Sequence, residues 1–293
     1  MTKTAYSHMI SPKQFGQVIG MSESSLKRWI DSGHLQVTRT VGGHRRISIK
    51  EALRFIRSRS LKVRDSSLLK ISVNTDSLSG DDCSSLFLHY LKKGMTEEAS
   101  QLLFNEFIKG ATIAELGDGP IKSALQIIAL EGDSPNIILM EHRATQLCIQ
   151  IINSLQELVV QEKTFFHAVG GAVSGDIYAL PSALVSAVLE ENHGATINLG
   201  PNTPISVFRE ASVLLDQSKK PNLVWISISE LKNPKELSKE LSRFAQECYE
   251  NKIELIVGGR SVGKLTLEHK PNLTLHASLK SISKQVTAFQ KQI

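Results

Sequence analysis

The sequence contains few cysteines, few aromatic residues and no long apolar run. Its 293 residues include 5% aromatics and only Cys83, Cys148 and Cys248. Three widely spaced cysteines form neither a zinc-binding pattern nor a disulfide framework, so both are excluded. No apolar segment approaches the roughly 20 residues that a membrane-spanning helix needs. The polar N-terminus also lacks the apolar core of a signal peptide. We therefore expect a cytoplasmic protein without a membrane partner.

Catalytic motifs are also missing. No Ser/His/Asp set, carboxylate pair or metal-ligand cluster has a recognisable spacing. The segment from Gly258 to Lys264 matches the glycine and lysine positions of a phosphate-binding loop, but Leu265 stands where Ser or Thr would hold magnesium. We expect no enzymatic activity and no metal site.

Charge is distributed unevenly along the chain. The whole chain has a net charge of +5, but residues 1–70 hold 14 basic and 4 acidic residues, a net of about +10. The remainder holds 20 basic and 25 acidic residues, a net of −5. A basic module on an acidic body is typical of a nucleic-acid-binding protein with a separate sensing or assembly region.

The basic segment begins with two short helix patterns. Ser11 and Pro12 are favourable N-cap and first-turn residues for a helix that ends at Gly20. Ser22 is a second N-cap residue, before a helix over residues 23–30. Two short helices joined by a glycine-containing turn predict a helix-turn-helix.

A β-hairpin pattern follows. Residues 34–40 predict one strand, Gly42 and Gly43 a tight turn, and residues 44–48 a second strand. Residues 49–56 predict a closing helix. The hairpin has the position of a wing beside the second helix, with its basic residues just beyond the tip.

These residues together resemble the DNA-binding domain of MerR-family transcription regulators. The resemblance rests on the run from Ser24 to Trp29 and on the wing sequence Gly42-Gly43-His44-Arg45-Arg46. The distance between this wing and the second helix adds to the resemblance. The resemblance implies that the second helix enters the major groove of DNA and that the wing arginines hold phosphates. The residues that it assigns to DNA binding are Ser24, Ser25, Lys27, Arg28, Arg39, His44, Arg45 and Arg46.

The middle of the chain predicts an antiparallel four-helix bundle. Polar residues 70–80 predict a linker, and helix patterns follow over residues 82–93, 96–110, 112–132 and 134–157. In the last helix, Ile138, His142, Thr145, Ile149 and Ile152 fall on one face. This spacing predicts that His142 lies in a buried apolar stripe.

The last 130 residues alternate strands and helices. Strand patterns cover residues 164–170, 195–199, 222–227, 253–257 and 273–277. Helices between them begin at Thr203-Pro204 and Asn233-Pro234, and a final helix covers residues 281–290. The pattern predicts an α/β domain with a five-stranded parallel sheet of the flavodoxin or Rossmann type, with ligands at the carboxyl ends of the strands.

The bundle and the α/β domain are similar to cobalamin-binding domains, particularly in light-sensing MerR regulators of the CarH and LitR type. Those domains carry Asp-x-His-x-x-Gly, whose histidine coordinates cobalt, and then Ser-x-Leu and Gly-Gly, which make room for the nucleotide tail. The corresponding residues here are Asp176 to Pro181, Ser227 to Ser229, and Gly258-Gly259. The bundle supplies the Glu141-His142 pair of the family's helical cap.

The chain departs from that pattern at the cobalt. Tyr178 replaces the coordinating histidine, and Pro181 replaces the motif glycine. Glu131 and Gly132 stand where light sensors have a shielding Trp and a second histidine. The resemblance therefore assigns Glu131, Glu141, His142, Tyr178, Ser227, Gly258 and Gly259 to a ligand pocket whose cobalt ligands are lost.

The resemblance divides the chain into a DNA-binding domain (residues 1–72), a helical cap (residues 80–160) and a sensor domain (residues 161–293). Three hypotheses follow for the function of the chain. The first is a DNA-binding transcription regulator, expected to be a repressor, whose sensor acts independently of light, with a protein partner or another small ligand. The second is a cobalamin-dependent, light-responsive regulator. The third is a cobalamin carrier subunit of a methyltransferase or mutase. The first two imply a dimer or tetramer on double-stranded DNA.

Overall fold

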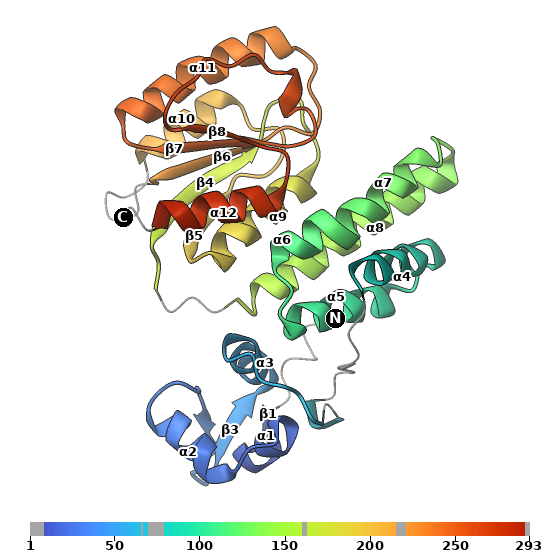
Figure 1. Cartoon of the computed structure of the whole chain (residues 1–293), viewed down its shortest axis with the longest axis vertical. Helices are drawn as coiled ribbons and strands as arrows, with labels where there is room; N and C mark the ends of the chain where they lie inside the picture. The colour runs from blue at the N-terminus through green and yellow to red at the C-terminus, as the bar shows by residue number, and fades with distance from the viewer. Residues whose placement is uncertain (1–8, 66, 70–78, 160–162, 215–220, 291–293) are drawn as a thin grey trace. The chain divides into compact units, whose positions relative to one another are not determined.

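The computed structural model describes residues 9–65, 67–69, 79–159, 163–214 and 221–290. The chain divides into two compact units (Figure 1). The first comprises Met1–Ala111 with Gly119–Val160, and the second comprises Thr112–Asp118 with Gln161–Ile293. The first unit thus holds both the basic module and the bundle. The division of the chain into three domains stays a prediction.

The basic module begins with two capped helices, as predicted. Helix α1 (Pro12–Ile19) starts at Ser11, whose hydroxyl accepts from the Gln14 amide while the Gln14 side chain accepts from the Ser11 amide. It ends at Gly20, which has a left-handed φ of 69°. Helix α2 (Glu23–Asp31) follows the cap residue Ser22.

A small antiparallel sheet and a third helix complete the module. The sheet has the order β1 (Met9–Ile10), β3 (Arg45–Ser48) and β2 (Thr38–Arg39), and α3 (Ile49–Ser58) follows it. The prediction of a strand over residues 34–40 was therefore too long. The amides of His34 and Leu35 donate to the Trp29 carbonyl, so this backbone terminates α2 instead of pairing in the sheet.

The four-helix bundle is confirmed, with one correction. Its helices are α4 (Gly80–Lys93), α5 (Thr96–Lys109), α7 (Lys122–Leu130) and α8 (Pro135–Gln156). The predicted helix over residues 112–132 is broken into α6 (Ile113–Leu116), a π-helical turn η3 (Gly117–Ile121) and α7. The break occurs because Gly119 has non-helical angles and Pro120 lacks an amide donor. Residues 70–78 of the predicted linker lie outside the described residues.

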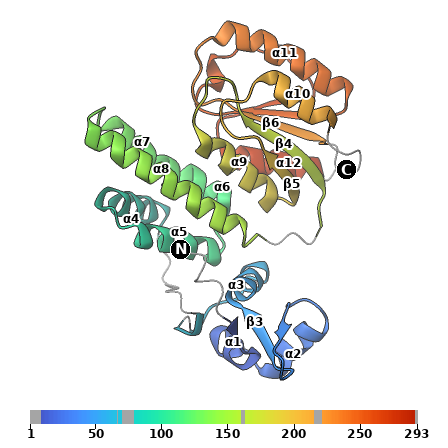
Figure 2. The same cartoon turned by 180° about the vertical axis from the view of Figure 1, so that it is seen from behind.

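The second unit, or α/β unit, contains the predicted parallel sheet. Its strands are β4 (Phe166–Ala172), β5 (Gly194–Asn198), β6 (Leu223–Ser227), β7 (Glu254–Gly258) and β8 (Leu273–His276), in the order β5-β4-β6-β7-β8. Its main helices are α9 (Ala179–Glu191), α10 (Ile205–Leu214), α11 (Pro234–Glu250) and α12 (Leu279–Gln290). Helices α9 and α12 cover one face of the sheet, and α10 and α11 cover the other (Figures 1 and 2).

Alternation along β6 decides which residues face each helical layer. Val224 and Ile226 belong to the core beneath α10 and α11, together with Leu241 and Phe244. Trp225 points to the opposite face, where its indole reaches α9. No helix in the described part of the chain is long and apolar enough to cross a membrane.

Candidate functional site

The outer face of α2 carries the residues predicted to contact DNA. Leu26 is buried, whereas Ser24, Lys27 and Arg28 are exposed and Ser25 is half-buried. Because Leu26 packs into the module, the side chains on the other side of the helix remain in solvent. This face can place hydroxyl and cationic groups against a polar, negatively charged partner.

The hairpin between β2 and β3 carries the other predicted contacts. Arg39 and His44 are exposed, and Arg46 is half-buried. Gly43 has a φ of 78° and no atom within 4 Å of an added Cβ, so this glycine serves the turn itself. Arg39 and Arg46 have no ion-pair partner within the described residues. Their charges are therefore available to an anion.

Arg45 differs from its neighbour. Its guanidinium donates to the Asp31 carboxylate at 2.6 Å, which joins β3 to the end of α2. Neighbouring strand residues point to opposite faces, so Arg45 and Arg46 cannot share one environment. The sequence pattern treated the two arginines as equivalent. In the structure one positions the hairpin and the other remains free.

The loops after β4, β6 and β7 meet at the carboxyl edge of the larger sheet. Asp176 is fully buried, and its carboxylate accepts from the amides of Tyr178, at 3.1 Å, and Ser229. Arg260 donates from Nε to the Ser229 carbonyl at 2.8 Å and lies 4.9 Å from the centre of the Tyr178 ring. The structure thus brings together the segments that resemble the cobalamin motifs.

Backbone atoms fill the space beside Gly258 and Gly259. A Cβ on Gly258 would lie 2.9 Å from the carbonyl oxygen of His276, and one on Gly259 would lie 2.4 Å from the carbonyl oxygen of Ile228. Ser227 is buried at the end of β6. Both glycines are therefore required by the close approach of neighbouring backbone, which accounts for them without a ligand.

The predicted cap residues lie in the other unit. Glu131 ends α7 and pairs with Lys92, while Glu141 is half-buried and His142 is exposed on α8. The prediction that His142 lies in a buried stripe was wrong. The buried residues of α8 are Ala144, Cys148, Ile151, Ile152 and Leu155. Of the predicted stripe only Ile152 is buried, because the bundle packs against a neighbouring face of α8 and leaves His142 in solvent.

These residues do not fit a cobalt-coordinated corrinoid. A phenol at Tyr178 is a poor substitute for an imidazole ligand. The Asp176 carboxylate accepts from two backbone amides, and the glycines of the Gly-Gly motif adjoin backbone. The described residues also contain no cluster of His, Cys, Asp or Glu that could hold a metal.

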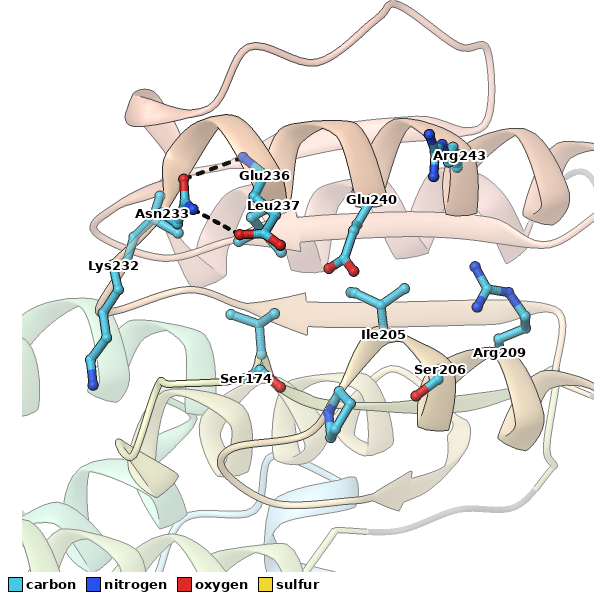
Figure 3. A pocket seen from close by; sticks show the side chains of 13 residues that line it. Ser174, Ile205, Ser206, Arg209, Lys232, Asn233, Glu236, Leu237, Glu240 and Arg243 are labelled. Carbon is cyan, nitrogen blue, oxygen red and sulfur yellow. Dashed lines mark hydrogen bonds between the residues drawn. The ribbon is translucent and has the colours of Figure 1, made fainter.

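A cleft that the sequence did not predict lies on the face of the sheet that α10 and α11 cover. It has a volume of about 500 Å³ and lies between α10 and α11, beyond the ends of β4 and β6 (Figure 3). Ile205 and Leu237 line it with apolar surface, and Glu240 points into the gap from α11. Across the gap, Arg209 binds Glu247 through Nε at 2.5 Å and Nη2 at 3.1 Å. The Thr203-Pro204 and Asn233-Pro234 helix starts were the available signal, since both fall at this edge.

Comparison with known proteins supports the fold alone. No family model matches the chain, and no curated protein matches its sequence. The structure is similar to the monomethylamine corrinoid protein of Methanosarcina barkeri, with a TM-score of 0.51 and 14% identity, over 72% of this chain and 100% of that one.

Two further solved structures are more distant. A methanol:cobalamin methyltransferase complex from Methanosarcina barkeri has a TM-score of 0.37 and 15% identity, over 80% of this chain and 95% of that one. A cobalamin-binding protein from Desulfitobacterium hafniense DCB-2 has a TM-score of 0.33 and 13% identity, over 74% of this chain and 100% of that one. The likeness to the monomethylamine corrinoid protein alone shows that the bundle and the parallel sheet have a cobalamin-binding type of fold.

Proposed function

We propose that this chain is a transcription regulator of the MerR type that binds specific double-stranded DNA sequences through its basic module. The observation that carries the proposal is the exposed polar face of α2 beside a hairpin with free arginines. A net charge of about +10 over residues 1–70 supplies the long-range attraction to phosphates.

In this proposal the contacts have separate roles. Helix α2 enters the major groove, where Ser24, Lys27 and Arg28 meet base edges and nearby phosphates. Arg39, His44 and Arg46 contact the backbone from the hairpin, which fixes the register without reading sequence. Arg45 acts as a positioning residue because its guanidinium is already held by Asp31.

The proposed active form is a dimer or tetramer that represses transcription. One module presents few base-contacting side chains, so two modules on two half-sites supply the specificity that one lacks. The Tyr178 phenol, which stands in place of a cobalt-coordinating imidazole, supports a regulator that acts independently of light and of cobalt chemistry. The cleft between α10 and α11 is a candidate entry point for a different small ligand.

Binding to selected DNA tests the proposal. The full chain should enrich a defined sequence from random duplexes, and Arg28→Ala should weaken binding by about 1–3 kcal/mol and relax specificity. Arg46→Ala should weaken binding to all duplexes and lower the salt slope by about one. Lys239→Ala, which removes an exposed cation on α11 in the other unit and outside the cleft, is the matched control. Failure to enrich any sequence, with uniform weak binding, would contradict the proposal.

A double-mutant cycle tests whether Arg45 acts through its ion pair with Asp31. Arg45→Ala and Asp31→Ala should each weaken DNA binding, and the double variant should lose little more than either single one. Additive losses would show that Arg45 contacts DNA by itself.

The fold favours one alternative, a corrinoid carrier subunit, because the likeness covers the whole of the Methanosarcina barkeri corrinoid protein. Absorption spectra of the chain after incubation with adenosylcobalamin, before and after illumination, distinguish the hypotheses. We expect no retained corrin band. A retained, light-insensitive band without DNA binding would favour the carrier, and a light-sensitive band with DNA binding would favour the light-responsive regulator. Tyr178→His alone should not restore photoswitching, since Gly132 also departs from the light-sensor pattern.

A further inference from the structure

Trp225 fills the space between the sheet and α9. Its side chain is only 1% exposed, and its residue pairs in register with Gly170 of β4. A Cβ built on Gly170 would lie 2.1 Å from Cδ2 of the indole. The ring therefore packs directly on the backbone of β4, and only a glycine can stand beneath it.

Hydrogen bonds fix the polar edge of this indole. Trp225 donates from Nε1 to Oγ of Ser182 at 3.2 Å, and Ser182 donates to Oδ1 of Asn198 at 2.8 Å. The same oxygen accepts from the Gly200 amide at 3.0 Å. Ser182 is fully buried on α9. The indole is thus satisfied at its one donor and connects β6, α9 and the end of β5.

This space is on the face where the corrinoid fold would need room. Trp225 and Ser227 are two residues apart on β6, so their side chains point to the same face of the sheet. The resemblance assigns Ser227 and the Gly-Gly pair to the room for the nucleotide tail of cobalamin. That tail ends in a benzimidazole, a fused two-ring aromatic of nearly the same size as an indole.

We infer that Trp225 occupies, from within the chain, the space that the base of a cobalamin tail would need. The α/β unit is therefore permanently filled on its α9 face and takes no cobalamin with an inserted tail. This inference does not rest on DNA binding, because it concerns the sheet and α9 alone. Cobalamin binding therefore meets two obstacles: Tyr178 stands in place of the cobalt ligand, and Trp225 occupies the space of the tail. A substitution at Tyr178 removes only the first.

The first test uses the chain with its own Trp225. Trp29→Phe leaves Trp225 as the one tryptophan, so its fluorescence reports the α9 face. Titration with hydroxocobalamin, and with cobinamide, which lacks the nucleotide tail, should leave the emission maximum of Trp225 at its buried position. Retained cobalamin together with a red shift of that emission would overturn the inference, because the ligand would then displace the indole.

The second test opens the space. Trp225→Gly should lower the melting temperature strongly and leave a cavity that accepts a two-ring aromatic, as buried apolar cavities do. Saturating 5,6-dimethylbenzimidazole should then raise its melting temperature by about 5 °C or more, with no effect on the unmodified chain. The matched control is Phe244→Ala, which opens the core on the opposite face of the same sheet.

The outcomes of the second test are decisive in both directions. Selective stabilisation of Trp225→Gly by the benzimidazole supports the inference. Equal stabilisation of Phe244→Ala, or none in either variant, overturns it. If Trp225→Gly does not fold, Trp225→Leu leaves a smaller cavity, and the same comparison with dimethylbenzimidazole applies.

Discussion

The basic module and the α/β unit differ in what surrounds their predicted functional residues. On α2 and the hairpin, Lys27, Arg28 and Arg39 remain exposed, so the side chains that the sequence assigns to DNA are available. In the α/β unit, the Gly-Gly positions adjoin backbone and Trp225 fills the adjoining face. The α/β unit has the expected parallel sheet, and the basic module has the two expected capped helices. The difference indicates that a fold depends on the spacing of its core residues, whereas a binding function also requires that the side chains and cavities of the site stay accessible.

The largest effect is expected from damage to the core of the α/β unit. Phe244 is 1% exposed beneath α11, so Phe244→Ala should reduce the stability of that unit by about 3–5 kcal/mol. Chemical unfolding followed by circular dichroism measures the loss. If the two regions act separately, binding of the full chain to single DNA half-sites should survive below the new unfolding transition. Loss of half-site binding at denaturant concentrations below that transition would mean that the module depends on the α/β core.

A smaller effect is expected at Asp118, between α6 and α7. Its carboxylate accepts from the amides of Leu279, at 3.0 Å, and Lys280, at 2.9 Å, and so caps α12 from a distant part of the chain. Asp118→Ala should destabilise the α/β unit by about 1 kcal/mol, the usual cost of a lost N-cap. Asp133→Ala, an exposed carboxylate in the first unit, serves as the control. Equal losses in both variants would remove the capping role.

The smallest expected effect is a pH dependence at His276. Burial lowers the pKa of His276 below its ordinary value of 6.5, and Nε2 has no partner among the described residues. As the pH falls through 6.5, the unfolded chain takes up this proton before the folded chain does, so stability falls. Urea unfolding at pH 7.5 and 5.0 should therefore show a larger loss for the unmodified chain than for His276→Gln. The same loss in both would contradict the assignment.

Buried thiols complete the contrast with the exposed module. Burial raises the pKa of Cys148 and of Cys248 to about 12, so both are thiols near neutral pH. Their contribution is apolar packing.

The order of helices and strands follows from local signals in the sequence. Ser11 and Ser22 marked helix starts, Gly20 and Gly94 marked helix ends, and the strand patterns of the α/β unit lay within two residues of the observed strands. These features depend on neighbouring residues along the chain, since caps, turns and periodicity act over a few positions.

Tertiary packing, in contrast, determines which surfaces are free. It paired Arg45 with Asp31, brought Asp118 to α12, selected the buried face of α8 and placed Trp225 against Gly170. Each of these contacts joins residues that are distant in sequence or selects between faces of equal periodicity. Local spacing shows which side chains share a face, but the packing of other elements determines whether that face meets solvent, a ligand or the protein itself.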